Sequence, residues 1–469
     1  MRLLPSRLAI LFLAAAACGE RTPSIPPPVN LYYWPVSAAI AAQPAGTSLL
    51  VVSTNYDLAY DPFSGGTVIA VDPAVPGTVG QPLTTLGAAR IASDGGVIGI
   101  ASSSACAIPQ SVAVVPSRYT RVINRLGLDA AGAPSCGDAC VVPIPQSPGD
   151  PFGLTVACTT ARHDAFVGFL QNAGTTPTVA AVDLDLRTPP DQAVRTFTVG
   201  SLGSVYGAAY DEVFDRLYLT IIGDVTTAPI QVIALGETPD PFQTGTPPPL
   251  LTTFDLTPLL RGAEVRGIAL SNPQPGLTRR AYVSVRVFDA DVANSIAGRP
   301  NYDVAGFLAV LDLPEGPLGA PLPQLIRLVP IGLGVDTLRV LPVRAPVAGA
   351  PVRDLVAVLA TDENTAQLYD DEQGVVRAIT GTSTGPFNPL DPTQPPDPSG
   401  LLAGVPQMGK QPTGLAVEQR TATVGGVTKP FDFIYVSSFF TSVVQVLRVD
   451  PDDPSSMTIV YGYGPVRAQ

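Results

Sequence analysis

The sequence predicts an all-β protein built from short strands, and three observations support this prediction. Its 469 residues include 51 prolines and 44 glycines, so turn formers interrupt the chain throughout and leave little room for long helices. Between these interruptions lie short runs rich in Val, Ile, Leu and Ala, and one unit made of such runs recurs along the chain. Because 46% of the residues are hydrophobic and only 14% are charged, the chain can bury a large core.

The recurring unit has a strand of small residues, a β-branched strand, a loop, and an alternating strand that often ends in Asp. Its clearest copy, among seven, is FDFIYVSSFFTSVVQVLRVD at residues 431–450. The first strands are expected at residues 36–42, 90–93, 152–158, 206–210, 265–270, 337–341 and 414–417. The second strands are expected at residues 49–52, 97–101, 165–169, 216–220, 281–285, 355–359 and 433–437. The third strands are expected at residues 67–72, 111–115, 178–183, 231–235, 307–312, 366–370 and 443–449.

A fourth strand follows the Asp turn in several units, as at residues 194–199, 325–330 and 457–461. Four short antiparallel strands repeated around a ring are the pattern of a β-propeller. The units start about 50 to 80 residues apart, so the blades carry insertions. The largest insertions are residues 128–149, 236–250, 286–305 and 381–409. We therefore expect a seven-bladed propeller of four-stranded blades over residues 31–469.

Each element of the unit has a physical reason to be where it is. The first strand converges on the propeller axis, where Gly and Ala fit, and the second is covered on both faces and so reads as continuously apolar. The Asp after the third strand suits a turn in which its side chain accepts hydrogen bonds from the following amides; calcium ligation is the alternative role. These aspartates are Asp72, Asp183, Asp312, Asp370 and Asp450.

The seventh unit resembles the YVTN family of seven-bladed propellers. Residues 435–438 (YVSS) match the signature strand of that family, and residues 444–450 match its following VxVxD strand. Residues 410–416 (KQPTGLA) look like its approach to the innermost strand, with echoes at residues 206–209 and 266–269. This resemblance implies the fold; such signatures specify function poorly.

The N-terminus resembles a bacterial lipoprotein signal. Arg2 and Arg7 precede an apolar run at residues 8–13, and small residues at 14–17 precede Cys18. The resemblance implies a signal peptide at residues 1–17, a lipidated Cys18 carrying an acyl group such as palmitate, a Pro-rich tether at residues 18–30, and export to the outer membrane. The alternative is a plain secretory signal followed by a chance cysteine.

Charge and cysteine content narrow the partners and the compartment. The formal net charge of −12 disfavours nucleic acid and anionic lipid surfaces, which need basic patches. Beyond the membrane anchor, the expected partner is an envelope protein or a glycan. The other four cysteines are expected to form disulfides in an exported protein, with three pairings open; Cys136 and Cys140 could close a small local loop. They are Cys106, Cys136, Cys140 and Cys158.

No motif supplies a convincing catalytic or metal centre, so we expect no cofactor and no metal. Residues 381–385 (GTSTG) match the G-x-S-x-G pattern but lack the strand, helix and downstream histidine that a nucleophile elbow needs. His163, the sole histidine, is expected in an exposed loop. Asp289, Asp291 and Asn294 resemble part of a calcium loop without its Gly and terminal Glu.

Propellers usually bind ligands at the face formed by the loops between second and third strands and by the blade connections. Phe439 and Phe440 would be binding anchors there, unless both pack under a neighbouring loop. Trp34 is expected to pack the N-terminal strand against the ring. The candidate binding residues on this face are Tyr56, Asp57, Tyr60, Asp61, Asp224, Arg286, Asp289, Asp362, Glu363, Asn364, Phe439 and Phe440. The leading hypothesis is a non-catalytic, membrane-anchored binding or assembly module of the cell envelope. The alternative is a lactonase-like or cofactor-dependent propeller enzyme.

Overall fold

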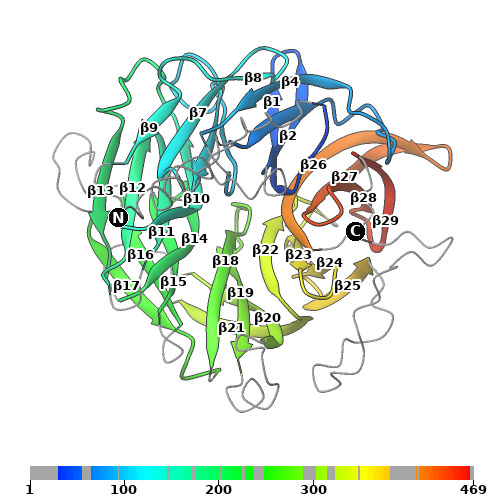
Figure 1. The fold of residues 1–469 in the computed structure, drawn as a ribbon. Coiled ribbons are helices and arrows are strands. Elements are labelled where there is room, and N and C mark those ends of the chain that lie inside the picture. The colour runs from blue at the N-terminus through cyan, green and yellow to red at the C-terminus, as the bar shows by residue number, and fades with distance from the viewer. Residues whose placement is uncertain are drawn as a thin grey trace, which may run out of the picture.

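The chain folds into a seven-bladed β-propeller, as predicted. The computed structural model describes residues 30–54, 65–92, 95–144, 148–171, 175–200, 202–223, 228–235, 248–260, 262–288, 303–313, 323–346, 349–380, 408 and 411–464. The strands of these residues form seven antiparallel sheets, six of four strands and one of five, and the described residues contain no helix. Figure 1 shows the sheets arranged as blades around a ring.

Each blade is formed by consecutive strands, with the first strand innermost. Blade 1 comprises β1 (Pro35–Gln43), β2 (Gly46–Ser53), β3 (Thr67–Val71) and β4 (Thr85–Arg90). Blade 2 comprises β5 (Gly99–Ala101), β6 (Val112–Ser117), β7 (Val122–Leu128), β8 (Pro134–Ser135) and β9 (Val141–Pro143). Blade 3 comprises β10 (Asp150–Thr159), β11 (Arg162–Leu170), β12 (Thr178–Asp183) and β13 (Val194–Thr198). Blade 4 comprises β14 (Ser204–Asp211), β15 (Arg216–Ile222), β16 (Pro229–Ala234) and β17 (Leu250–Asp255).

The remaining three blades follow the same order. Blade 5 comprises β18 (Ala263–Leu270), β19 (Arg280–Phe288), β20 (Asp303–Asp312) and β21 (Gln324–Gly332). Blade 6 comprises β22 (Val335–Val340), β23 (Leu355–Ala360), β24 (Thr365–Asp370) and β25 (Val375–Thr380). Blade 7 comprises β26 (Pro412–Val424), β27 (Val427–Ser438), β28 (Val443–Asp450) and β29 (Asp453–Tyr463).

The prediction for blade 2 was wrong by one strand. Residues 90–93 were expected to form its innermost strand and residues 97–101 its second. Instead, Arg90 ends β4 at the outer edge of blade 1, and β5 is innermost in blade 2. The small residues of β4 have another cause. A Cβ atom on Gly87 would lie 2.7 Å from the Cβ of Ala133, in the β7–β8 turn of the next blade. Gly87 of β4 is therefore required by the neighbouring blade and not by closeness to the axis.

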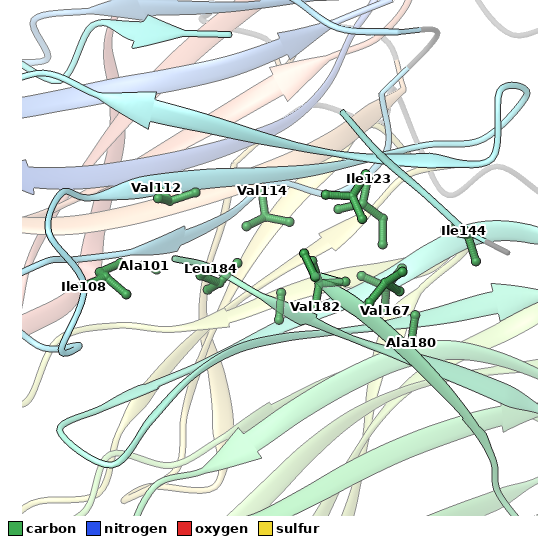
Figure 2. Packing of buried hydrophobic residues seen from close by; sticks show 14 of the residues in the cluster. Ala101, Ile108, Val112, Val114, Ile123, Ile144, Val167, Ala180, Val182 and Leu184 are labelled. Carbon is green, nitrogen blue, oxygen red and sulfur yellow. The ribbon is translucent and has the colours of Figure 1, made fainter. Parts of the chain in front are cut away.

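The hydrophobic core lies between the blades. Seven clusters of buried side chains each join two consecutive blades, and one of them joins blade 7 to blade 1. Figure 2 shows the cluster between blades 2 and 3, where Val112, Val114 and Ile123 face Val167 and Val182. Because both faces of each blade are covered, the middle strands are apolar without alternation.

The ring closes without exchanging a strand between the two ends of the chain, because β26 to β29 form blade 7 by themselves. Side-chain contacts close it instead. The hydroxyl group of Tyr463 donates to the carbonyl of Val75 at 2.9 Å, and that of Tyr461 donates to the carbonyl of Pro73 at 2.9 Å. The ring of Trp34 packs on Phe439 of the β27–β28 loop, with 4.7 Å between centroids. Trp34 thus fixes the N-terminal segment to the last blade.

The Asp turns serve as predicted. Asp72, Asp183, Asp370 and Asp450 each accept a hydrogen bond from the amide two residues ahead, at 2.8 to 3.1 Å. Asp312 instead accepts one from the side chain of Arg280 at 2.8 Å.

Two disulfides join the four cysteines, Cys106 to Cys158 and Cys136 to Cys140. The first connects blades 2 and 3, and the second closes the small loop that the sequence suggested. Structural disulfides of this kind indicate an exported protein. None of the described residues forms a helix long and apolar enough to cross a membrane.

Candidate functional site: the axial pocket

A pocket of about 330 Å³ opens where the innermost strands begin, and all seven blades line it. We call it the axial pocket. Much of its wall is apolar, and a few polar and aromatic side chains interrupt it. Those that matter below are Arg118, Phe152, Tyr206, Asp336, Arg339 and Phe439. A mostly apolar cavity of this size with a few convergent polar groups is the usual form of a small-ligand site.

The mouth of the pocket is shaped by an irregularity that recurs in six blades. The first and second strands lose register at the start of β1, β10, β14, β18, β22 and β26. Such bulges redirect side chains and often border functional sites. Here they allow neighbouring backbones to approach closely. A Cβ atom on Gly207 would lie 2.5 Å from the carbonyl oxygen of Arg266, and one on Gly267 would lie 2.3 Å from that of Asp336.

Hydroxyl groups bond these backbones together around the mouth. Thr220 donates to the carbonyl of Arg266, and Ser284 donates to that of Asp336 at 2.7 Å. Thr337 donates to the carbonyl of Thr413 at 2.8 Å, and Thr413 donates to that of Pro35 at 3.3 Å. These contacts join blades 4, 5, 6, 7 and 1 in turn. The mouth is therefore a preformed scaffold, and a ligand would meet little reorganisation cost there.

A continuous row of rings and charges crosses one side of the pocket. The Arg118 guanidinium lies 5.5 Å from the centroid of the Phe152 ring, which packs on Tyr206 with 4.7 Å between centroids. On the other side of Tyr206, the Arg266 guanidinium lies 4.5 Å from the ring centroid. These contacts hold both aromatic rings in place at the pocket wall.

The row ends at Asp336, whose carboxylate is already satisfied. The Tyr206 hydroxyl donates to Asp336 Oδ2 at 2.7 Å, and an Arg286 nitrogen lies 3.6 Å from the same oxygen. Burial, together with the adjacent Asp336 charge, raises the pKa of the Tyr206 hydroxyl far above its usual value of 10.0. Tyr206 is therefore a fixed hydrogen-bond donor, and Asp336 is a neutralised part of the wall.

A second cavity, of about 500 Å³, opens at the opposite end of the axis. Leu154, Ala208, Ile268, Leu415 and Arg339 line both cavities, so they mark the level at which the two approach each other. Arg339 is the one charged residue common to both linings.

The structure brings some of the sequence-predicted residues to this site. Phe439 lines the axial pocket, whereas Phe440 lies outside its lining and is 38% exposed. Phe440 packs on Trp34 with 5.5 Å between centroids, so the aromatic pair is partly used inside the protein, as the alternative interpretation held. Arg286 contributes through Asp336 and also bonds the carbonyl of Val335 at 3.1 Å.

The other predicted residues lie at the edge of the site or outside the described part. Asp362, Glu363 and Asn364 form the β23–β24 turn, where the Asn364 side chain accepts a hydrogen bond from the amide of Gln411 at 2.7 Å. Gln411 lines the pocket. Burial raises the pKa of Glu363. The predicted residues outside the described ones are Cys18, Tyr56, Asp57, Tyr60, Asp61, Asp224, Asp289, Asp291, Asn294 and the 381–385 loop.

His163 lies second in β11, with its Nε2 atom 3.4 Å from Asp183 Oδ1, in a surface position away from the pocket lining. Across the described residues, no group of three or more His, Cys, Asp or Glu side chains lies close enough to hold a metal ion.

The sequence interpretation missed Arg118, Phe152, Tyr206, Asp336 and Arg339. It concentrated on loops, whereas most of these residues begin the innermost strands. A signal did exist: the runs at 206–209 (YGAA), 266–269 (RGIA) and 336–339 (DTLR) occupy the same place in successive units, and an Arg replaces Ala in the third.

Comparison with known proteins establishes the fold and no more. No protein-family model and no curated protein sequence matches the chain. Among solved structures, a chain of hydrazine synthase from Kuenenia stuttgartiensis is similar, with a TM-score of 0.54 and 10% identity over 92% of this chain and 100% of that chain. The periplasmic gluconolactonase of Pseudomonas aeruginosa has a TM-score of 0.48 and 13% identity over 94% of this chain and 100% of that chain. Identities this low carry no information about ligand or activity.

Proposed function

We propose that this protein is an exported, lipid-anchored binding module of the cell envelope that takes a small ligand in its axial pocket. One observation carries the proposal: residues from all seven blades converge on a pocket whose mouth is held rigid by bulges and inter-blade hydrogen bonds. A preformed cavity with ordered aromatic walls and a few polar groups suits recognition. An envelope protein or a glycan remains the expected natural partner.

The ionisable groups of the wall support binding rather than turnover. Asp336 accepts the Tyr206 hydroxyl and faces Arg286, so its charge is used inside the wall. Tyr206 keeps its proton because burial raises its pKa. A hydroxyl that keeps its proton suits a binding surface better than general acid–base catalysis.

A fragment screen tests the pocket. We expect ligand-observed NMR to find fragments that bind the wild type and that lose binding in Ala208→Phe, because the added ring fills the channel at the level common to both cavities. Phe152→Ala should weaken the same fragments by removing an ordered aromatic surface. Val213→Phe is the matched control, since Val213 belongs to the same blade but is 53% exposed in the β14–β15 turn.

Binding that survives both pocket variants would refute the proposed site. Hydrolysis of a bound lactone would favour the lactonase-like enzyme over the binding module. Bound fragments should therefore also be followed for turnover.

The anchor has a separate test. Cys18→Ala should abolish incorporation of labelled palmitate and release the protein from the membrane fraction. Unchanged labelling would leave a plain secretory signal as the correct interpretation of residues 1–17.

A further inference from the structure

The two cavities approach each other at a level where one blade differs from the rest. Gly207 in blade 4 and Thr337 in blade 6 hold equivalent positions in their first strands. Two residues further along, each first strand has a residue that lines the channel. In six blades this position holds a small residue. These residues are Ala39, Gly99, Thr155, Ala209, Ala269 and Ala416. In blade 6 it holds Arg339, which lines the cavities on both sides. The six small residues leave the space into which a guanidinium can extend.

Arg339 has no carboxylate partner among the described residues. Among the described residues, its one hydrogen bond runs from Nη1 to the carbonyl of the preceding residue, Leu338, at 3.0 Å. The other arginines that line the two cavities are paired: Arg118 lies 4.0 Å from Asp150, and Arg279 lies 3.2 Å from Asp211. A guanidinium offers five N–H donors, so most of those on Arg339 have no acceptor in the described part of the chain.

Such a charge is costly to the unliganded protein. Burial lowers the pKa of Arg339, which reports that its charged form is poorly solvated. Arg339 is half-buried and has no counter-ion among the described residues, so its charge is available to an entering anion. An entering oxyanion could accept two parallel hydrogen bonds from the guanidinium.

The remaining lining defines the rest of the ligand. Phe152, Tyr206 and Phe439 contribute aromatic surface to the axial pocket, and Leu154 and Leu415 contribute apolar surface near Arg339. Asp336, the one carboxylate in the lining, is already held by Tyr206 and Arg286. Arg118, at the mouth, favours the approach of an anion although the chain as a whole has a net charge of −12.

We propose that Arg339 binds the carboxylate of a small organic acid whose ring or alkyl body rests against the aromatic wall of the axial pocket. This inference rests on the proposed function and specifies the chemical class of its ligand. The acid is recognised by one half-buried guanidinium at the level common to both cavities and by apolar contacts above it.

The test compares an acid with its neutral isostere. Isothermal titration with phenylacetate and phenylacetamide should show at least about tenfold tighter binding of the acid by the wild type, since a hydrogen-bonded charge contributes about that much. Arg339→Gln should abolish the difference, and Arg339→Lys should keep part of it because it keeps a charge without the planar fork. Arg195→Gln is the matched control: Arg195 also donates to the preceding carbonyl, at 2.8 Å, but lies exposed on β13.

Phenyl phosphate and inorganic phosphate test whether the site prefers a phosphate group to a carboxylate. Tighter binding of either than of phenylacetate would overturn the assignment of a carboxylate. Equal affinities for acid and amide, both lost in Ala208→Phe, would overturn the role of Arg339 while the pocket stands. If the wild type bound neither phenylacetate nor phenylacetamide, and if no fragment lost binding in Ala208→Phe, the axial pocket itself would be refuted as a ligand site.

Thermal unfolding separates a ligand-binding role from a structural one. Without ligand, Arg339→Gln should unfold at the same temperature as the wild type or about 1–2 °C higher, because an unpaired charge is removed. A fall of several degrees would make Arg339 a structural residue and overturn the proposal.

Discussion

The interface between blades 2 and 3 and the axial channel each contain an arginine on a strand. The two arginines differ in how many hydrogen-bond acceptors surround them. Arg125, on β7, is fully buried and donates to the carbonyls of Ala139, Asp183, Asp185 and Thr188 at 2.8 to 3.3 Å. Arg339, on β22, makes one hydrogen bond within the described part of the chain, to the carbonyl of its own neighbour Leu338. Burial lowers the pKa of both guanidinium groups.

The difference separates a structural cation from one available to a ligand. At the interface, carbonyl oxygens replace the lost water, and a covalent bond and an apolar cluster add to the same contact. In the channel, the described residues offer the Arg339 guanidinium one carbonyl acceptor, that of Leu338. A protein can keep an unsatisfied buried charge where binding requires it, at some cost in stability.

The largest expected effect comes from the disulfide at the interface. Cys106→Ser with Cys158→Ser should lower the free energy of unfolding by about 4 kcal/mol, because that bond joins positions 52 residues apart and restricts the unfolded chain strongly. Denaturant unfolding under oxidising conditions measures the change. The pair Cys136→Ser and Cys140→Ser is the control, with an expected loss of about 2 kcal/mol for its 4-residue separation. Equal losses would contradict the chain-entropy argument.

Arg125→Met comes next. It keeps the length and apolar stem of the side chain but leaves buried carbonyls without a donor, so we expect a loss of about 3 kcal/mol in stability. Affinity for phenylacetate should stay unchanged, which is the reverse of the pattern expected for Arg339→Gln. If Arg125→Met changed binding as strongly as stability, the two arginines could not be assigned separate roles.

A further effect, which arises group by group, concerns pH. Burial raises the pKa of Asp354 and of Asp432 to about 6, although hydrogen bonds from Asn272 and Gln419 offset part of it. Because the folded state then binds more protons than the unfolded state, stability should fall as pH rises from about 4 to about 6, by about 3 kcal/mol for each group, and then level off. Asp432→Asn should remove its share of the slope in urea titrations at several pH values.

The same pH series sharpens the comparison. A guanidinium keeps its charge over this range, so the preference for phenylacetate over phenylacetamide should not follow the stability profile. A preference that declined in step with stability between pH 4 and 6 would point to one of the buried carboxylates instead of Arg339.

The repeat predicted most of the fold because its causes are local. Turn residues punctuate the strands, and the aspartates after the third strands bond amides two residues ahead, so neither feature needs distant contacts. Blade 2 shows the limit of this approach. Gly87 of β4 is required by Ala133 of the next blade, and such an external cause is invisible in the strand itself.

The candidate site was predicted only in part for a related reason. Phe439 could be identified because a pair of aromatics in a loop is unusual, but its contact with Trp34 joins positions at opposite ends of the chain. The hydrogen bond from Tyr206 to Asp336 spans 130 residues. No local sequence pattern predicts such a pair.

The sequence by itself determined the strand pattern, the number of blades and the apolar faces between them, because strand periodicity and turn chemistry act over a few residues. Only the tertiary structure decided which side chains meet on the axis. Closure of the ring sets seven first strands side by side, and bulges turn their first residues toward one mouth. Arg339 stands where the other six first strands hold Ala, Gly or Thr. It therefore becomes a cation in a channel, because its surroundings come from the six other blades.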